Sequence, residues 1–312
     1  MSLPRERVVH ESPIPSGLPL AEWRETRDTL HMWMQIVGKT RLALAPMQNH
    51  WWHVPLYVTA RGLTTTPIPY GPRTFAVDFD FIDHRLVVVT TEGARREIGL
   101  RPQAVADFYQ EYLRALAALD ITVKLWPVPV ETDHTIPFPD DRVHASYDAD
   151  HVGRFFAMLV QADRIMKRFA GRFLGKSSPV HFFWGAFDLA LTRFNGRRAP
   201  AHDPKESLIL REANSHEEIS FGWWPGSGNV TVPAFYAYAR PEPPALATAP
   251  IRPAAAYYSR ELADFVLPHD AAASSASLDA TVLDFFQSAY DAAADLAGWD
   301  RAALDRPRGE WP

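Results

Sequence analysis

The order of the predicted secondary structure constrains the fold of this 312-residue chain most, because one series of elements occurs twice. A helix, a run of short alternating strands and a second helix are predicted over residues 20–126, and again over 148–300. Three pairs of segments match in the same order: 32–35 with 158–161, 56–59 with 189–192, and 105–110 with 282–287. We therefore predict an α+β fold of two pseudo-repeated helix–antiparallel meander–helix halves, packed about a pseudo-twofold axis, with the helices on the apolar face of a continuous or paired sheet. The alternative is chance similarity between amphipathic segments.

Proline marks the segments outside the two halves. Four prolines and no apolar period predict an irregular arm over residues 1–19, and four more prolines predict a stiff connector over residues 127–147. The predicted organisation is an N-terminal arm (1–19), a first α+β repeat (20–126), a Pro-rich connector (127–147), a second α+β repeat (148–300) and a C-terminal tail (301–312).

Hydrophobic periodicity sets the predicted elements. Helices are expected over 21–45, 102–119, 148–173 and 277–296. Strands are expected over 49–61, 74–81, 86–91, 97–100, 122–126, 178–193, 217–224, 234–238 and 262–267, with a loop over 194–214. The first helix also carries Arg27, His31 and Gln35 as a polar stripe at i, i+4 spacing.

The predicted strand over 49–61 has two different faces, because alternate residues of a strand point to opposite sides. One face is apolar, and the other is aromatic and polar. The apolar face comprises Trp52, Val54, Leu56, Val58 and Ala60, and the polar face comprises Trp51, His53, Tyr57, Thr59 and Arg61. A strand with that second face lies on solvent or lines a site.

Composition excludes several classes of function. A net charge of −5 without a basic block argues against nucleic acid as a partner. The absence of cysteine excludes disulfides, thiolate metal sites and a cysteine nucleophile. The N-terminus leads into no apolar signal core, and no run reaches the roughly 18 apolar residues of a membrane span, so we expect no membrane association and a cytoplasmic location.

The matched strands bring imidazole, carboxylate, guanidinium and indole groups to one face of the predicted sheet. That mixture is typical of a small-molecule site. The predicted catalytic residues are His53, Asp188 and Asp78, and the predicted substrate-binding residues are Trp51, Tyr57, Arg61, Trp184, Thr192 and Trp224. The alternative is the solvated face of an open antiparallel sheet, on which three tryptophans would be unusual.

A metal site is a separate expectation. His50 and His53 would point to opposite faces of a strand, so their spacing does not form a site. The predicted metal ligands are instead His53, His216 and Glu218, a set of two imidazoles and a carboxylate that would suit zinc or iron. No spacing in the sequence enforces this set, so the cofactor stays unknown.

The function expected from this site is that of an enzyme acting on a small organic substrate between the two halves, with or without a metal. His53 would be the general base or a metal ligand, Asp188 or Asp78 would orient it, and Arg61 would bind an anionic group. Two alternatives stay open. One is a non-catalytic binding protein that uses the same aromatic pocket. The other is a scaffold whose exposed aromatic residues form the interface of an oligomer, such as a homo-oligomer.

The chain also resembles an uncharacterised family of bacterial proteins that is catalogued only as a domain of unknown function. The resemblance covers nearly the whole chain. It rests on the segments 30–33, 50–57, 161–164, 179–185, 221–226 and 254–258, among them His50-Trp51-Trp52-His53 and Phe221-Gly222-Trp223-Trp224. The family has no known activity, so the resemblance implies none here.

Overall fold

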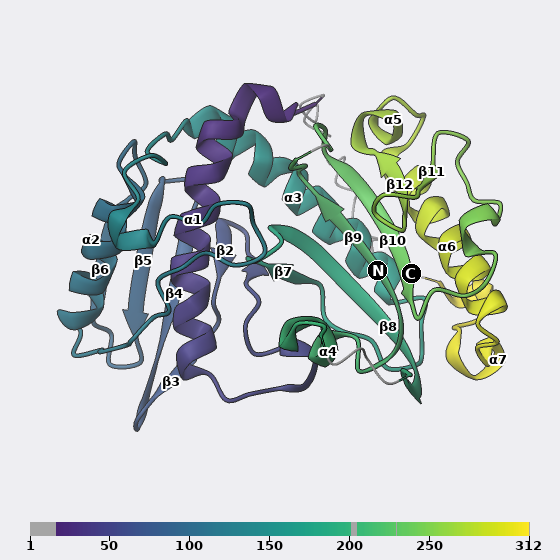
Figure 1. The fold of residues 1–312 in the computed structure, drawn as a ribbon, viewed down its shortest axis with the longest axis horizontal. Helices are drawn as coiled ribbons and strands as arrows, with labels where there is room; N and C mark the ends of the chain where they lie inside the picture. The colour runs from purple at the N-terminus through teal and green to yellow at the C-terminus, as the bar shows by residue number, and fades with distance from the viewer. Residues whose placement is uncertain (1–16, 201–204, 229, 312) are drawn as a thin grey trace, which may run out of the picture.

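The fold is α+β and consists of two antiparallel sheets with long helices packed on them, as the sequence predicted (Figure 1). The computed structural model describes residues 17–200, 205–228 and 230–311. Residues 1–16 of the predicted arm, residues 201–204 of the predicted loop and Pro312 of the predicted tail lie outside this range. Within the described residues, no helix is long and apolar enough to cross a membrane.

The first sheet contains the meander predicted between residues 74 and 100. Its strands run in the order β1–β2–β4–β5–β6, and β3 pairs with the start of β4. The strands are β1 (Tyr57–Val58), β2 (Gly62–Thr64), β3 (Ile68–Tyr70), β4 (Arg73–Asp80), β5 (Arg85–Thr90) and β6 (Arg95–Gly99). Phe75, Val77 and Phe79 are buried, so alternation along β4 correctly predicted which face meets the core.

The second sheet has the order β11–β12–β10–β9–β8–β7, and all of its pairings are antiparallel. Its strands are β7 (His181–Phe183), β8 (Asp188–Arg198), β9 (His216–Trp224), β10 (Ala234–Arg240), β11 (Tyr257–Ser259) and β12 (Asp264–Pro268). Ile219, Phe221 and Trp223 pack into the core, and Glu218 and Ser220 point to the other face, as the alternation of β9 predicted.

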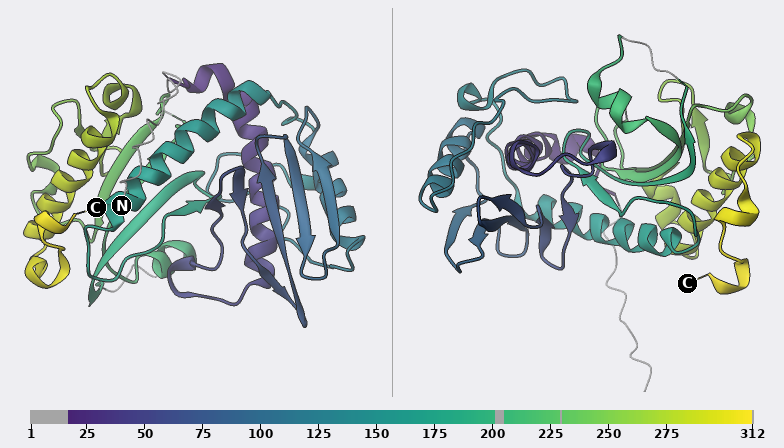
Figure 2. Two further views of the ribbon diagram at one scale, coloured as in Figure 1. Left: turned by 180° about the vertical axis from the view of Figure 1, so that it is seen from behind. Right: turned by 90° about the horizontal axis from the view of Figure 1, so that it is seen from below.

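The long helices lie on opposite sides of the two sheets (Figure 2). In the orientation of Figure 1, α1 (Leu20–Leu44) and α2 (Val105–Ala117) lie in front of the first sheet. The helices α3 (Ala149–Ala170) and α6 (Leu278–Leu296) lie behind the second sheet, and α3 also contacts β1. In the described ranges of the chain, the front of the second sheet therefore carries no long helix. The short α4 (Leu208–Ala213) lies over it.

The two sheets are joined at one point. The backbone N–H of Leu56 donates to the carbonyl of Phe182, and the N–H of Phe182 donates to the carbonyl of Leu56, both at 2.9 Å. Along the chain, each half contains a helix, antiparallel strands and a further helix. The pseudo-twofold repeat of the two halves stays a prediction.

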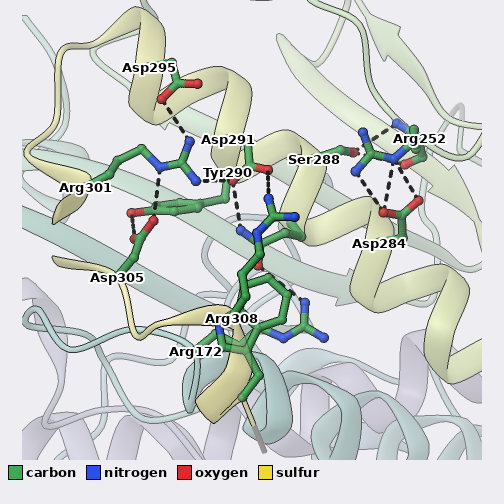
Figure 3. A network of polar contacts seen from close by, with 12 residues as sticks. Arg172, Arg252, Asp284, Ser288, Tyr290, Asp291, Asp295, Arg301, Asp305 and Arg308 are labelled. Carbon is green, nitrogen blue, oxygen red and sulfur yellow. Dashed lines mark hydrogen bonds and ion pairs between the residues drawn. The ribbon is translucent and has the colours of Figure 1, made fainter.

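The C-terminal segment is fixed to α6 by a network of ion pairs (Figure 3). This segment contains the short helix α7 (Arg301–Leu304), whereas the short helix α5 (His269–Ala273) precedes α6. Arg301 pairs with Asp291, Asp295 and Asp305, and the hydroxyl of Tyr290 donates to Asp305 at 2.5 Å. The described part of the predicted tail is therefore packed on the second half.

The predicted strand over 49–61 is wrong, because most of that segment forms turns. Asn49–Trp51 is a 3₁₀-helix in which His50 and Trp51 have φ angles of 56° and 59°. The N–H of Val54 returns to the carbonyl of Trp51 at 3.0 Å, and Pro55 has no N–H to give to a strand ladder. Only Tyr57–Val58 forms a strand, so the two predicted faces do not exist.

Three other predicted elements also differ. The strand over 178–193 is two strands, β7 and β8, separated by a turn in which Phe187 has a φ of 64°. The segment 122–126 has no strand partner. The segment predicted as a loop over 194–214 contains the end of β8 and the helix α4. The side chain of Ser207 caps the N-terminus of α4 by accepting a hydrogen bond from the N–H of Leu210.

Candidate functional site

A cavity of about 440 Å³ lies on the front of the second sheet, under α4 and beside α1. Its floor consists of side chains from β8, β9, β10 and β12. Its walls come from α1, the 3₁₀-helix at 49–51, the connector and the turn between β7 and β8. The lining side chains are Lys39, Leu42, His50, Trp51, Trp52, Val54, Val130, Glu131, Phe183, Trp184, Ala186, Asp188, Ala190, Thr192, Phe194, Ile209, Leu210, Ala213, Asn214, Glu218, Ser220, Tyr236, Tyr238, Arg240, Leu262 and Asp264.

Strand alternation places the floor residues on one face, in rows across the sheet. One row joins Thr192, Ser220 and Tyr238, and the next joins Phe194, Glu218 and Arg240. A third row joins Ala190, Gly222 and Tyr236. The opposite face of the same strands packs against α3 and α6, so the polar side chains are left on the free face.

Gly222 makes room for Tyr236 in the third row. A Cβ atom at position 222 would overlap the ring of Tyr236. Because Gly222 has no side chain, the ring of Tyr236 crosses β9 at this position and its hydroxyl reaches β8. There it donates a hydrogen bond to Oδ2 of Asp188.

Asp188 is a buried carboxyl group of the cavity. It is 8% exposed, and its Oδ1 atom has no hydrogen-bond partner among the described residues. Burial raises the pKa of Asp188 to about 7; Tyr236 lowers it and Glu131 raises it further. Both protonation states of this carboxyl are therefore populated near neutral pH.

Two more carboxyl groups on the floor have raised pKa values. Burial raises the pKa of Glu218 to about 8 and that of Asp264 to about 7, and Arg240 opposes both shifts. Arg240 lies 3.8 Å from Oδ1 of Asp264, and its guanidinium carbon lies 4.6 Å from the ring centre of Tyr238. The floor thus holds more carboxyl groups than cations, which favours protonated carboxyl groups near neutral pH.

The aromatic wall is fixed by hydrogen bonds from indole nitrogens. The N–H of Trp184 donates to the carbonyl of Val54 at 2.9 Å, and the N–H of Trp51 donates to the carbonyl of Ile209 at 3.0 Å. The Trp184 ring lies against Gly38 of α1, where any Cβ atom would overlap it. Close helix packing therefore decides where this ring stands.

The polar stripe predicted on α1 is buried and holds the loops of the cavity. His31 contacts the carbonyls of Trp184 and Gly185 at 3.0 and 2.9 Å, and Gln35 makes hydrogen bonds with both backbone groups of Val130. Burial lowers the pKa of His31 to about 3, so this imidazole is neutral at physiological pH and donates to a carbonyl. The stripe positions the turn before Asp188 and the connector at Val130.

Five of the predicted site residues line the cavity: Trp51, Trp184, Asp188, Thr192 and Glu218. Trp224 lies on the same face of β9 but lines a smaller adjoining hollow with Ala186 and Asp188. Strand alternation placed Asp188, Thr192, Glu218 and Trp224 on the expected face, whereas Trp51 and Trp184 reach the cavity from a 3₁₀-helix and a turn.

The other predicted site residues lie elsewhere. His53 is 3% exposed and its Nδ1 accepts from the N–H of Gln48, because residues 49–56 turn instead of extending along the sheet. Tyr57 packs under the guanidinium of Arg41, and Arg61 pairs with Asp80 and Asp83. Asp78 lies on β4 of the first sheet, and His216 contacts Ser215 at the start of β9. The structure does not bring His53 or Asp78 to Asp188 in the cavity.

The predicted metal ligands are also not assembled into one site. His53 and His216 do not line the cavity that contains Glu218. Across residues 17–200, 205–228 and 230–311, no group of three histidine, aspartate or glutamate side chains has an arrangement that could hold a metal ion.

Several cavity residues were missed by sequence reasoning. Alternation along β10 would have placed Tyr236 and Tyr238 on the same face as Arg240. Lys39 continues the i, i+4 stripe of Arg27, His31 and Gln35 by one further step, and that spacing could have revealed it. Glu131 has no such signal, because its position depends on how the connector packs.

Comparison with known proteins gives a family and no activity. No curated protein and no solved structure matches the chain. One family model matches residues 15–306, which is most of the chain, and its description reads "Family of unknown function". The chain therefore belongs to this family of unknown function, DUF5996.

Proposed function

We propose that this protein is an enzyme that acts on a small organic substrate in the cavity of the second sheet, by general acid–base chemistry. One observation carries the proposal: the buried carboxyl group of Asp188 lines the cavity, is held at Oδ2 by Tyr236, and has no hydrogen-bond partner at Oδ1 in the described part of the chain. A buried acceptor without a partner is costly to a fold, and a substrate group that donates to Oδ1 would remove that cost.

The lining suits a molecule with an apolar body and a few polar groups. A volume of about 440 Å³ falls within the usual range of small-molecule sites. Trp51, Trp52 and Trp184 supply flat apolar walls, whereas the polar groups gather on the floor. Such a division orients a ligand, because its polar end can be satisfied only at the floor.

Asp188 and Glu218 would take different roles in proton transfer. With a pKa of about 7, Asp188 is partly ionised near neutral pH and can accept a proton. With a pKa of about 8, Glu218 is mostly protonated there and can donate one. This assignment replaces His53 and Asp78, which were expected to act as base and orienting group.

A non-catalytic binding protein is the second candidate. The observation that favours it is the aromatic wall, because Trp51 and Trp184 are fixed by hydrogen bonds and can stack on a flat ligand without any reaction. The oligomeric scaffold stays a third proposal, tested by sedimentation of the wild type and of Trp224→Ala. A cytoplasmic location also remains a proposal, which fractionation of cells that express the chain would test.

The experiment is a thermal-shift screen of small metabolites on the wild type and three variants. A ligand that binds only the folded state raises the melting temperature. Ala186→Trp fills the cavity from an exposed position, Asp188→Asn keeps the shape but removes the acid, and Glu25→Gln is the control on the exposed side of α1. We expect some metabolites to bind the wild type and Glu25→Gln with equal affinity. The same metabolites should bind Ala186→Trp at least about tenfold more weakly.

Turnover then separates the two candidates. If Asp188→Asn binds a hit but no longer converts it, the enzyme is supported. If the wild type binds hits and converts none, the binding protein is favoured. A screen in which hits bind Ala186→Trp as well as the wild type would remove the cavity from consideration. Metal analysis of the purified wild type tests the zinc or iron variant independently.

A further inference from the structure

Lys39 is a buried lysine on the wall of the cavity. It lies on α1, is 3% exposed and lines the cavity with Trp184 and Glu131. Its Nζ atom lies 5.9 Å from the ring centres of both Phe138 and Trp184. Lysine is rarely buried unless it is paired, so this position needs an explanation.

Among the residues that the structure describes, no carboxylate neutralises the ammonium group of Lys39, and its side chain forms neither an ion pair nor a hydrogen bond. Its Nζ atom lies near two aromatic rings instead. The neighbouring buried arginines of α1 are different. Arg27 pairs with Asp28 at 2.8 Å, and Arg41 donates to the carbonyl of Pro55.

Burial without an anion favours the uncharged amine. Desolvation lowers the pKa of Lys39 to about 8 from its ordinary value of 10.5. A lysine desolvated in an apolar pocket has a larger fraction of free amine at neutral pH, and the free amine is a nucleophile. The other four lysines, at 124, 167, 176 and 205, are all exposed.

We propose that Lys39 is a nucleophilic residue that forms an imine with the carbonyl group of an aldehyde or ketone bound in the cavity. The proposal rests on the proposed function, since it names the class of substrate for the same cavity. It also gives a role to a lysine that the acid–base chemistry of Asp188 and Glu218 does not use.

The reaction balances without an oxidant or a reductant. The lone pair of Nζ forms a bond to the carbonyl carbon, and the carbonyl oxygen takes up a proton as the nitrogen loses one. The resulting carbinolamine loses its hydroxyl group as water, after a carboxylic acid of the cavity protonates it. The product is a protonated imine, and addition of water reverses every step.

The cavity contains the groups that these steps need. The titratable and charged groups that share the lining with Lys39 are His50, Glu131, Asp188, Glu218, Tyr236, Tyr238, Arg240 and Asp264. Carboxyl groups with raised pKa values can donate the proton that removes the hydroxyl group, and Asp188 and Glu131 are such groups in the lining of this cavity.

Reductive trapping with benzaldehyde tests the proposal directly. The full-length protein is incubated at pH 7.5 with benzaldehyde and sodium cyanoborohydride, and peptide mass spectrometry measures benzylation of each of the five lysines. We expect Lys39 to be labelled roughly tenfold or more faster than any exposed lysine, because far more of it is unprotonated. Lys124→Met is the matched control and should leave labelling of Lys39 unchanged.

The outcomes distinguish a failure of imine formation by Lys39 from a failure of ligand binding in the cavity. Labelling in proportion to exposure, with Lys39 slowest, overturns the proposal. If benzyl alcohol and benzaldehyde raise the melting temperature equally and Lys39 is not labelled, the cavity binds the probe and the imine is excluded. If Lys39 is labelled equally fast in Ala186→Trp, the amine is reactive but the cavity does not deliver its substrate, so the proposed function fails and the reactivity of Lys39 stands.

Discussion

The hydroxyl of Tyr236 donates a hydrogen bond to the carboxyl group of Asp188 across a glycine that lies between their strands. Tyr236 on β10 is paired with Gly222 on β9, and Asp188 is at the start of β8. One missing side chain therefore permits the contact that holds the carboxyl group of Asp188. The interaction links a position in the sequence to the chemistry of the site.

Gly222→Ala should destabilise the fold. The new methyl group overlaps the ring of Tyr236 and the carbonyl of Leu189, so the ring must move and Asp188 loses its donor. We expect the free energy of unfolding to fall by about 1–3 kcal/mol, measured by urea denaturation. Gly153→Ala on α3 is the control, because a Cβ atom there meets nothing within 4 Å. If both variants unfold at the same urea concentration as the wild type, the steric argument fails.

Glu218→Gln should stabilise the protein increasingly as the pH rises. Burial raises the pKa of Glu218 from 4.5 to about 8, so the folded state binds more protons than the unfolded state between these values. The free energy of unfolding of the wild type therefore falls as pH rises through that window. We expect the variant to gain roughly 1–4 kcal/mol over the wild type between about pH 5 and pH 8. A constant difference, like that expected for the exposed Glu25→Gln, would contradict the raised pKa.

Lys39→Met should have the opposite pH dependence. The pKa of Lys39 is lowered from 10.5 to about 8, so the unfolded state binds more protons between these values. The stability of the wild type therefore rises with pH in this window, whereas methionine has no proton to lose. We expect the variant to be more stable by roughly 1–3 kcal/mol at about pH 7, with the difference shrinking toward pH 10. Lys124→Met, at an exposed position, should match the wild type throughout.

Arg193 is held by aromatic rings behind the second sheet, and its removal should be costly. Its guanidinium carbon lies 3.8 Å from the ring centre of Phe169 and 4.6 Å from that of Tyr290, and one N–H donates to the carbonyl of Phe169 at 2.7 Å. Arg193→Ala leaves a hole at a site that is 1% exposed, so we expect a loss of about 3–5 kcal/mol in unfolding experiments. Arg193→Met fills the space and removes a buried charge, so it should retain more stability than Arg193→Ala. Equal losses would show that packing is not the cause.

The sequence predicted the sheets well where a strand has one buried face. Along β4 and β9, large apolar residues alternate with polar ones, and the structure buries the expected side. The same rule placed Glu218 and Thr192 on the free face, where they line the same cavity as Asp188. These predictions succeed because a shift of one residue would put the whole apolar set into water.

The sequence failed at segments whose shape depends on distant partners. Residues 49–56 have the composition of a strand, yet the N–H of His50 donates to Glu212 of α4, and Pro55 interrupts any ladder. For this reason His53, the expected base, does not line the cavity. The i, i+4 spacing could have revealed the position of Lys39, but not its environment, because Phe138 and Trp184 are 99 and 145 residues away in the sequence.

The sequence by itself determined the α+β class, the main helices and strands, and which side of the second sheet carries polar groups, because these follow from local periodicity and the burial of apolar surface. Only the tertiary structure decided that α3 and α6 cover the back of that sheet while its front stays open to the cavity. It also decided which acids and which lysine are buried there. A pKa depends on the solvent and charges around a group, and distant segments supply both.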